Sequence, residues 1–181
     1  MIDWVNITLK ELAGYVSEQL RKRGIETVLV GGACVTIYTE NRYQSYDLDY
    51  VTYEDMKKVK KALLELGFTE KARYFQHEGC PWFVEFVSPP AAVGNEYVRT
   101  FNNVETPFGK IKLLRPVDSV KDRLGAFYHW NDKQGLEQAV NICLQQDIDL
   151  SEVESWSLSE GQGKKFATFL ERFKEASIPE T

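Results

Sequence analysis

The chain has few of the residues that define several common classes of protein. Its three cysteines, Cys34, Cys80 and Cys143, are scattered and form no C-x-x-C pair. A disulfide framework or a zinc site is therefore not expected. No apolar run approaches the length of a membrane span, and the opening M-I-D-W-V-N carries no basic-then-apolar signal. We expect a protein of the reducing cytoplasm with no membrane association.

Positive charge is also scarce. Lys and Arg number 22 against 27 Asp and Glu, so the formal net charge is −5. That balance argues against a protein that coats nucleic acid through bulk electrostatics, although it leaves room for a local basic patch. Hydrophobic residues make up 43% of the chain and aromatic residues 13%, which is enough for a packed core and excludes wholesale disorder.

The most informative stretch runs from Val28 to Val51. A short apolar run leads into Gly31-Gly32, a helix-compatible segment follows, and a second apolar stretch contains Asp47 and Asp49. A glycine pair at a strand-to-helix turn lets the backbone approach a phosphate, and a helix N-terminus favours that anion. We interpret Gly31-Gly32 as a phosphate cradle.

Asp47 and Asp49 are predicted to lie on one face of a strand. Alternate side chains of a strand point the same way, which places these two about 7 Å apart. Two carboxylates that close repel each other unless a cation lies between them. Mg²⁺ is the simplest candidate, because it prefers oxygen ligands and is usually completed by substrate phosphates. The pair therefore predicts a metal site facing the cradle.

This combination resembles the nucleotidyltransferase superfamily that includes DNA polymerase β, whose pattern is hydrophobic-Gly-Gly/Ser, a helix, then Asp-x-Asp. Arg42 and Ser45, in R-Y-Q-S-Y-D-L-D, make the chain look most like the AbiEii-like and minimal nucleotidyltransferase branch. The resemblance covers residues 25–87, and residues 116–139 more loosely. Many members have Gly-Ser, whose serine contacts the terminal phosphates. This chain has Gly32-Ala33 there and lacks that hydroxyl.

The resemblance implies two further site residues. A third acid on a following strand completes the metal site in the family, and Glu85, in P-W-F-V-E-F-V, stands at that place. A cation on a later helix helps to hold the triphosphate, and Arg123, in R-L-G-A, matches that pattern. Lys121 is an alternative, but residues two apart do not share a helical face, so we favour Arg123. The structural alternatives are an outward-facing Glu85 on an edge strand and a solvent-exposed Arg123.

The other candidates also have structural alternatives. Arg42 either lies near the phosphates or is an ordinary solvated charge. Ser45 either belongs to the nucleotide site or turns the chain before the strand. The lysines within residues 57–61 form a patch for an RNA acceptor or, as we favour, a solvated helix face.

Strand and helix patterns alternate in the first part of the chain, and helices dominate later. The expected strands are residues 26–30, 48–51, 81–87, 97–101 and 110–114, with a turn around Asn102 and Asn103. The expected helices begin near Thr8, Ala33, Asp55, Val117, Lys133 and Gly163, and the helix after Asp55 buries Met56, Val59, Leu63 and Leu66. This order predicts an α/β (α+β) fold with a mixed sheet flanked by helices. Residues 1–115 are expected to form the nucleotidyltransferase sheet domain, and residues 116–181 a C-terminal helical segment packed on it.

The predicted activity is transfer of a nucleoside monophosphate from a nucleoside triphosphate to an acceptor, with two Mg²⁺ ions held by Asp47, Asp49 and Glu85. The sequence leaves the acceptor open. Relatives modify transfer RNA ends, partner proteins or small molecules, and many belong to toxin–antitoxin pairs. One rival is a catalytically silent interaction module of such a pair, which the retained acids disfavour. The other is a Ca²⁺- or Mg²⁺-stabilised structural domain, which Gly31-Gly32 disfavours.

Overall fold

The structure, a computed structural model, describes residues 2–179. Its main-sheet strands are β1 (Val28–Val30), β2 (Asp47–Val51), β3 (Phe68–Lys71), β4 (Tyr74–His77), β5 (Phe83–Val87), β8 (Phe101–Thr106) and β9 (Gly109–Leu114). A separate ribbon consists of β6 (Ala92–Val93) and β7 (Glu96–Tyr97). The helices are α1 (Leu9–Arg21), α2 (Gly32–Tyr38), α3 (Met56–Glu65), α4 (Pro116–Trp130), α5 (Lys133–Gln145), α6 (Leu150–Ser159) and α7 (Gly163–Ala176).

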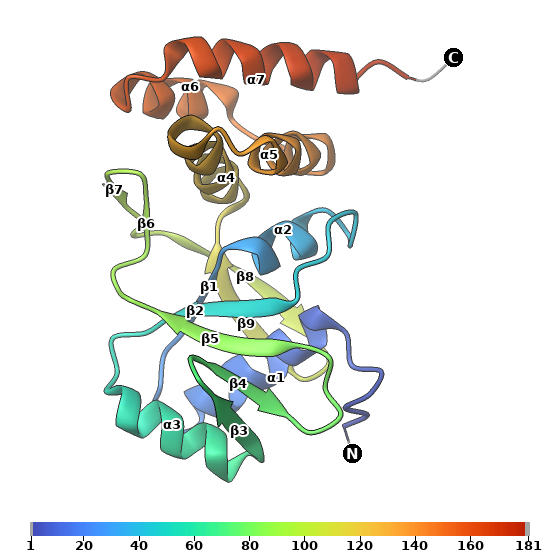
Figure 1. Cartoon of the computed structure of the whole chain (residues 1–181), viewed down its shortest axis with the longest axis vertical. Helices are drawn as coiled ribbons and strands as arrows, with labels where there is room; N and C mark the ends of the chain where they lie inside the picture. Colours follow the sequence, from blue (N-terminus) through green and yellow to red (C-terminus); the bar gives the residue numbers. More distant parts are fainter. Residues whose placement is uncertain (1, 180–181) are drawn as a thin grey trace.

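The main sheet is mixed, with the strand order β3-β4-β5-β2-β1-β9-β8. β2 lies in the middle, parallel to β5 and antiparallel to β1. In Figure 1 the helices α4 to α7 are stacked above the sheet, α2 lies between them and β2, and α1 and α3 lie on the lower side. The predicted α/β fold with a mixed sheet flanked by helices is confirmed.

The two faces of β2 follow from its alternating sequence. Leu48 and Tyr50 are fully buried, and the Tyr50 hydroxyl donates to the Ala13 carbonyl of α1 at 3.0 Å. Asp47 and Asp49 have the opposite parity and therefore point to the other face. β2 therefore has its apolar side chains on the face toward α1 and its two acids on the face toward α2.

α1 begins where expected, after Thr8, at a capping box. The Thr8 hydroxyl accepts from the Glu11 backbone N–H, and the Glu11 carboxylate accepts from the Thr8 backbone N–H. Leu12, Val16 and Leu20 are fully buried, as their helical spacing predicts. The amphipathic pattern therefore fixes both where this helix starts and which side packs on the sheet.

Several local expectations are wrong. Asn102 and Asn103 lie inside β8, paired with Leu113 and Lys112 of β9, and do not form a turn. Sheet pairing outweighs the turn preference of asparagine here. Met56, predicted to be buried, is 45% exposed because it stands at the first position of α3, beyond the packed part of the helix.

Other elements differ in extent or were not expected. The first strand begins at Val28 rather than Glu26. The β3–β4 hairpin and α6 have no counterpart among the expected elements, whereas α5 and α7 begin at the expected residues, Lys133 and Gly163. The hairpin adds two strands beyond β5, so β5 is an interior strand of the sheet.

The helices after residue 115 pack mainly on one another. Arg172 of α7 forms a two-point ion pair with Glu137 of α5, at 2.7 and 2.8 Å. One link to the sheet side is Tyr38 of α2, whose hydroxyl donates to the Leu114 carbonyl at the end of β9, at 2.6 Å, and whose own carbonyl accepts from Gln146, which follows α5. The end of α2 is thereby tied to the end of β9 and to the end of α5.

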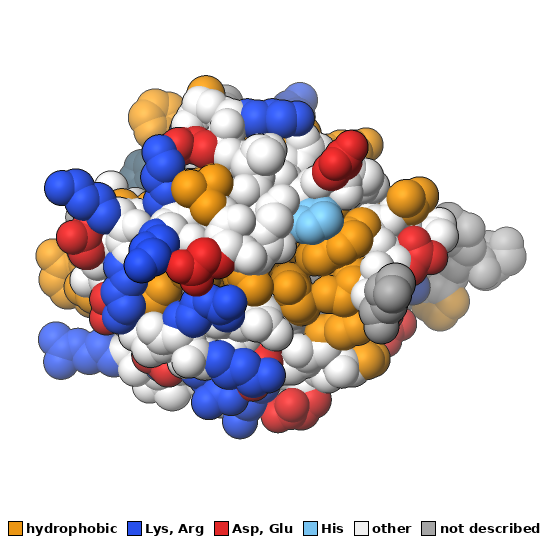
Figure 2. Space-filling model, turned by 90° about the horizontal axis from the view of Figure 1, so that it is seen from below, with side chains coloured by type: hydrophobic (Ala, Val, Ile, Leu, Met, Phe, Trp, Pro, Cys, Tyr) orange, Lys and Arg blue, Asp and Glu red, His pale blue; other side chains and the backbone are white. Residues whose placement is uncertain are grey.

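The lysines of α3 lie on the lower side of the molecule, where Figure 2 shows Lys and Arg side chains interspersed with Asp and Glu. Lys58 pairs with Glu54 at 3.0 Å, and Lys60 pairs with Glu70. These pairs support the favoured interpretation of a solvated helix face. Within residues 2–179, no helix combines the length and the apolar character that crossing a membrane demands.

Candidate active site

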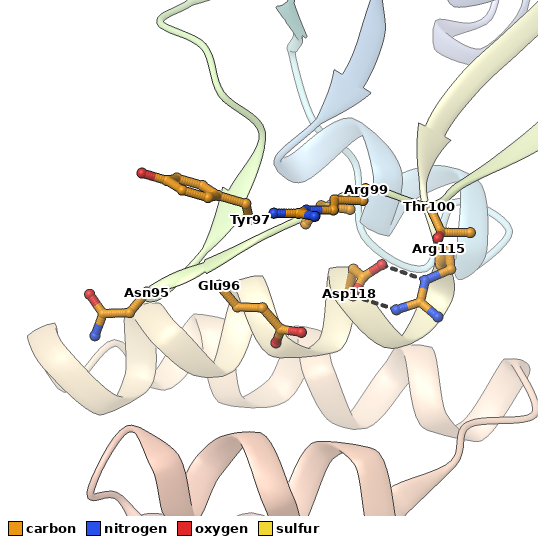
Figure 3. Close-up of a pocket in the computed structure, with 8 residues that line it drawn as sticks. Asn95, Glu96, Tyr97, Arg99, Thr100, Arg115 and Asp118 are labelled. Atoms are coloured by element: carbon orange, nitrogen blue, oxygen red, sulfur yellow. Dashed lines mark hydrogen bonds and ion pairs between the residues drawn. The ribbon is translucent and has the colours of Figure 1, made fainter.

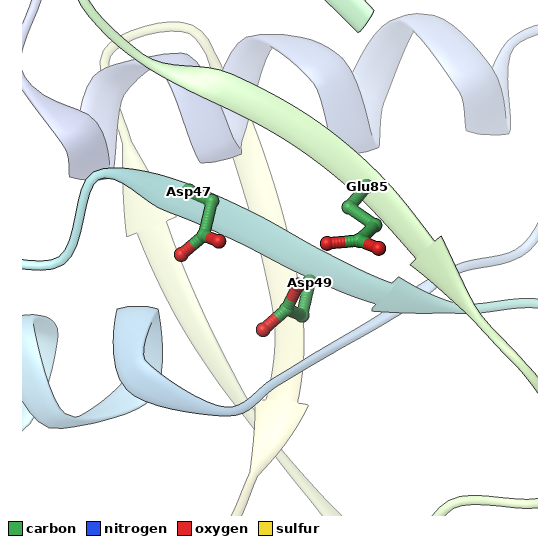
Figure 4. A group of neighbouring side chains, drawn as sticks. All are labelled: Asp47, Asp49 and Glu85. Atoms are coloured by element: carbon green, nitrogen blue, oxygen red, sulfur yellow. The ribbon is translucent and has the colours of Figure 1, made fainter. Parts of the chain in front are cut away.

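Three carboxylates meet on the face of the sheet toward α2. β2 and β5 are parallel and in register, with Asp49 opposite Glu85. One oxygen from each of Asp47, Asp49 and Glu85 lies within 4.8 Å of the others, and the three side chains converge in Figure 4. Each residue is partly buried. The predicted convergence of these three acids is confirmed, and the outward-facing alternative for Glu85 is excluded.

The cluster carries more negative charge than its surroundings balance. Burial, followed by the neighbouring Asp47 and Glu85 carboxylates, raises the pKa of Asp49 to about 6, and Arg123 opposes this rise. Carboxylate oxygens at this mutual distance are the donor set of a hard divalent cation such as Mg²⁺. The three side chains therefore fit the group that the sequence pattern predicts.

Gly31 lies directly against Asp49, and Gly32 lies against Ser45, which is hydrogen-bonded to Asp47. Gly31 has φ of +69°, and a Cβ added there lies 2.7 Å from Asp49 Oδ2. A Cβ on Gly32 lies 3.1 Å from Ser45 Oγ. The first position requires glycine for its backbone conformation and for its close contact with a carboxylate. The glycine pair thus brings a stretch of backbone without side chains next to Asp49 and Ser45.

Ser45 is positioned to orient Asp47. Its hydroxyl donates to Asp47 Oδ1 at 3.0 Å and to the Asp47 carbonyl at 3.1 Å. Its backbone N–H donates to Thr36 Oγ1 at 2.9 Å, which ties the turn to α2. The residue is 4% exposed, so its hydroxyl is committed to these contacts. The structure therefore places Ser45 behind the acid and supports a positioning role.

We expect Ser45→Ala to weaken divalent-ion binding about 10- to 100-fold, because hydrogen-bond partners of metal ligands contribute that much. Isothermal titration with Mn²⁺, a spectroscopically and calorimetrically convenient substitute for Mg²⁺, measures it. Ser155→Ala, on α6, is the control. Unchanged affinity in Ser45→Ala would show that Asp47 does not depend on this hydroxyl.

Arg123 and Lys121 point to different environments, as their spacing predicts. The Arg123 guanidinium is held by Asp122, with Nε 3.1 Å from Oδ2, and by Gln138 of α5. Its charge reaches Asp49, where it lowers the pKa of the carboxyl. Arg42 is exposed, and its side chain makes no hydrogen bond or ion pair to any residue between 2 and 179. Of the two favoured cations, Arg123 is fixed near the acids and Arg42 is free in solvent.

Lys121 belongs to a separate ion network that joins α4 to α6 and to the β6–β7 ribbon. Its ammonium is 2.9 Å from Glu152, 3.2 Å from Glu96 and 3.8 Å from Asp118. Beside it, a cavity of about 480 Å³ is lined by residues 95–100 with Arg115 and Asp118. Figure 3 shows Arg115 paired with Asp118, at 2.7 and 3.0 Å. The charges of Glu96, Arg115 and Asp118 are paired within this network, whereas the exposed Arg99, which also lines the cavity, makes no ion pair or side-chain hydrogen bond to residues 2–179. We interpret the cavity as part of the contact between α4, α6 and the β6–β7 ribbon.

Lys121→Met is expected to lower the free energy of unfolding by about 1–3 kcal/mol, because Lys121 is only 1% exposed and its loss leaves Asp118 with one cation fewer. Glu96 and Glu152 are partly exposed, which keeps the loss below that of a fully buried pair. Urea unfolding measures the change, with Lys133→Met as the exposed control. A loss no larger than the control's would contradict the assigned network.

One residue of the site carried no signal in the sequence. Arg73, in the turn between β3 and β4, places Nε 3.1 Å from Glu85 Oε1 although its side chain is 71% exposed. Recognising it requires the β3–β4 hairpin and the β4–β5 register, which place Tyr74 opposite Glu85. Arg73 is the nearest cation to the third acid.

Comparison with known proteins gives a likeness of fold. No family model matches the chain, and no curated protein matches it significantly. It is similar to an antigenic nucleotidyltransferase-like protein from Paracoccidioides brasiliensis, with a TM-score of 0.59 and 15% identity over 74% of each chain. It is also similar to the lincosamide antibiotic adenylyltransferase LnuA, in its lincomycin-bound structure, with a TM-score of 0.55 and 17% identity over 78% of this chain and 99% of that one. The fold is that of the nucleotidyltransferases.

Proposed function

We propose that this protein is a metal-dependent nucleotidyltransferase. The acceptor's hydroxyl oxygen forms a bond to the α-phosphorus of a nucleoside triphosphate, the bond to the β-phosphate oxygen breaks, and pyrophosphate leaves. The observation that carries the proposal is the convergence of Asp47, Asp49 and Glu85 beside Gly31-Gly32, on a fold shared with nucleotidyltransferases. A cluster of repelling carboxylates beside a glycine turn without side chains suits a cation and a phosphate chain.

The acidic residues of the site are proposed to bind the metal ions and to accept the proton of the acceptor hydroxyl. Asp47, Asp49 and Glu85 would hold Mg²⁺, two ions as we propose, which neutralises the phosphates and stabilises the leaving group when bound. A carboxylate of the same cluster would take the proton of the attacking hydroxyl, and Glu85 is our candidate because it lies farthest from the glycine strand in the order β5-β2-β1.

The remaining candidates act on the phosphates. Gly31-Gly32 offers backbone N–H groups without side chains to obstruct them. Arg123, held at a fixed place by Asp122, supplies positive charge near Asp49, and Arg42 is free to reach a bound triphosphate. Ser45 orients Asp47. Ala33 supplies no hydroxyl, so these groups hold the terminal phosphates without it.

The finer assignments are part of this proposal. We propose that the chain belongs to the AbiEii-like and minimal branch, works in the cytoplasm as one half of a toxin–antitoxin pair, and is organised as a sheet domain of residues 1–115 with a helical segment of residues 116–181. The R-Y-Q-S-Y-D-L-D pattern supports the branch. A small helical partner encoded beside the gene, and co-purification of the two chains, would support the pair. Failure of a co-expressed neighbour to bind would contradict it.

A nucleoside triphosphate with Mg²⁺ should raise the melting temperature, because a ligand that binds only the folded state shifts unfolding by mass action, by about 2.7 kcal/mol at a hundredfold excess over Kd. A thermal-shift screen of the four triphosphates, each with Mg²⁺ or EDTA, measures this. The matched variant is Asp47→Asn, which should lose the metal-dependent part. No metal-dependent shift with any triphosphate would favour the catalytically silent interaction module.

A further inference from the structure

The acidic cluster continues into an open strip of the sheet. Glu85 on β5 is opposite Tyr74 on β4, and Phe83 is opposite Asp47 on β2, so these side chains share one face. Tyr74, Phe83 and Glu85 are only partly buried. Their neighbours on the other face, such as Val84, are fully buried. The core therefore lies on one side of β4 and β5, and the side that carries the acids is accessible to a ligand.

This strip has aromatic rings and cations beside the acids. The Tyr74 and Phe83 rings lie 5.7 Å apart at 52°. The Arg73 guanidinium lies 4.9 Å above the Tyr74 ring, donates to the Tyr74 hydroxyl at 2.6 Å, and pairs with Glu85. Lys71, opposite Tyr74, adds a second cation and donates to Gln76 at 2.8 Å. Of the described side chains of β3, β4 and β5 on this face, Glu85 is the sole acid.

The order of the strands indicates which of the two reactants, the triphosphate or the acceptor, lies on the strip. The glycine cradle follows β1 on one side of β2, and β5 and β4 lie on the other side. In an in-line displacement the attacking oxygen and the leaving pyrophosphate lie on opposite sides of the α-phosphorus. If the β- and γ-phosphates lie at Gly31-Gly32, the acceptor approaches from the side of Glu85. The strip is then the surface that the acceptor meets.

We propose that Arg73, Tyr74 and Phe83 bind the acceptor, and that the acceptor is the terminal nucleotide of a single-stranded RNA. This inference rests on the proposed nucleotidyltransferase function. Partly exposed aromatic rings can stack on nucleobases, and an arginine beside them can pair with the backbone phosphate. A cationic acceptor such as an amino sugar would meet Arg73 and Lys71 and, among the described side chains on this face of β3, β4 and β5, no carboxylate other than Glu85. The charges of the strip suit an anion with a planar ring.

In this arrangement Arg73 can pair either with Glu85 or with an RNA phosphate, but not with both at once. In the structure it pairs with Glu85. When RNA binds, its guanidinium turns to the phosphate and releases the Glu85 carboxylate to the metal site. The terminal ribose hydroxyl then attacks the α-phosphorus, its proton passes to Glu85 and on to solvent, and pyrophosphate departs. Arg73 is thus a positioning residue that links acceptor binding to completion of the acidic cluster.

Fluorescence anisotropy of a short fluorescein-labelled single-stranded RNA, titrated with the full chain and Mg²⁺, tests the surface. Tyr74→Leu and Phe83→Leu should each weaken binding about tenfold, because each removes a stacking ring. Tyr74→Phe keeps the ring and should bind like wild type. Arg73→Gln should reduce the salt dependence of binding by about 0.7 in log–log slope, the value for one phosphate of a single strand. Trp130→Leu, whose ring is 82% exposed on α4, and Lys133→Gln are the controls.

The melting temperature of each variant shows whether it folds, and its Mg²⁺–triphosphate shift reports the nucleotide site separately. The inference predicts weaker RNA binding in the three strip variants, with the triphosphate shift retained in Tyr74→Leu and Phe83→Leu. Equal RNA binding by wild type and strip variants would overturn it, as would transfer to an aminoglycoside without any binding of RNA. A missing triphosphate shift in wild type would overturn the proposed function instead, and ring-dependent RNA binding would still support the surface.

Discussion

Asp49→Asn is expected to abolish transfer of labelled nucleotide from an α-labelled triphosphate. Asn is nearly the size of Asp and fits the same place on β2, between β1 and β5. It lacks the negative charge that holds a divalent cation, whose contribution to the transition state is several kcal/mol. The rate should fall by about a thousandfold or more. Incorporation into an acceptor from cell extract, followed over time, measures the loss.

The same substitution should stabilise the metal-free protein. The pKa of Asp49 is raised to about 6 by burial and by the neighbouring acids, above the ordinary value of 3.8. The folded state therefore holds a proton that the unfolded state has released between these pH values, and stability falls as pH rises through this window. Above about pH 6 the penalty is complete, on the order of 2 kcal/mol.

Urea unfolding in EDTA at several pH values checks this. The gain in Asp49→Asn over wild type should be largest above about pH 6 and should shrink as the pH falls through about 4, because Asp49 is neutral in both states only below its ordinary pKa of 3.8. Asp147→Asn, at an exposed position between α5 and α6, is the control and should show no such trend. A variant that is less stable than wild type at neutral pH would show that the carboxylate is not repelled by its neighbours.

Gly31→Ala is expected to cause the second large loss. Its φ of +69° and ψ of −149° are open almost only to glycine, at a cost of about 1–3 kcal/mol for another residue. Its Cβ would also lie 2.7 Å from Asp49 Oδ2, so the carboxylate or the backbone must move. Displacement of either group on the order of 1 Å can reduce the rate about a hundredfold. Melting temperature and the transfer assay together measure the two effects.

Substitutions at two other glycines distinguish the effect of backbone strain from the effect of the close contact with Asp49. Gly161 also has positive φ, +72°, but no atom within 4 Å of an added Cβ, so Gly161→Ala should cost stability and retain activity. Gly125, inside α4 with nothing within 4 Å, should tolerate alanine and gain about 0.5–1 kcal/mol. Full activity in Gly31→Ala would mean that the backbone at this turn does not contribute to the reaction.

Most of the site on β1, α2 and β2 is predictable from sequence, because it rests on local spacing. The alternation of Leu48 and Tyr50 with Asp47 and Asp49 fixes which face carries the acids. The glycine pair at the end of an apolar run marks the turn. Glu85 follows from the family pattern. Its own strand, with apolar residues at both parities, does not determine its face.

The parts that escaped prediction depend on contacts between distant segments. The β3–β4 hairpin has exposed residues on most of β3 and lacks a clear apolar alternation, so it gives a weak local signal. Its place beside β5 brings Arg73 to Glu85, a pairing of residues 12 apart that only the β4–β5 register reveals. The role of Ser45 similarly depends on a hydroxyl direction that spacing does not fix.

Comparing two positions of label in one triphosphate tests the central claim most directly. The purified full chain, with Mg²⁺ and cell extract as the source of acceptor, is supplied with triphosphate labelled at the α- or the γ-phosphate. Nucleotidyl transfer at the Asp47, Asp49 and Glu85 cluster predicts that α-label enters an acceptor, that γ-label leaves with pyrophosphate, and that Asp49→Asn does neither. Label that enters from the γ-position, or incorporation that survives Asp49→Asn, would contradict the assignment.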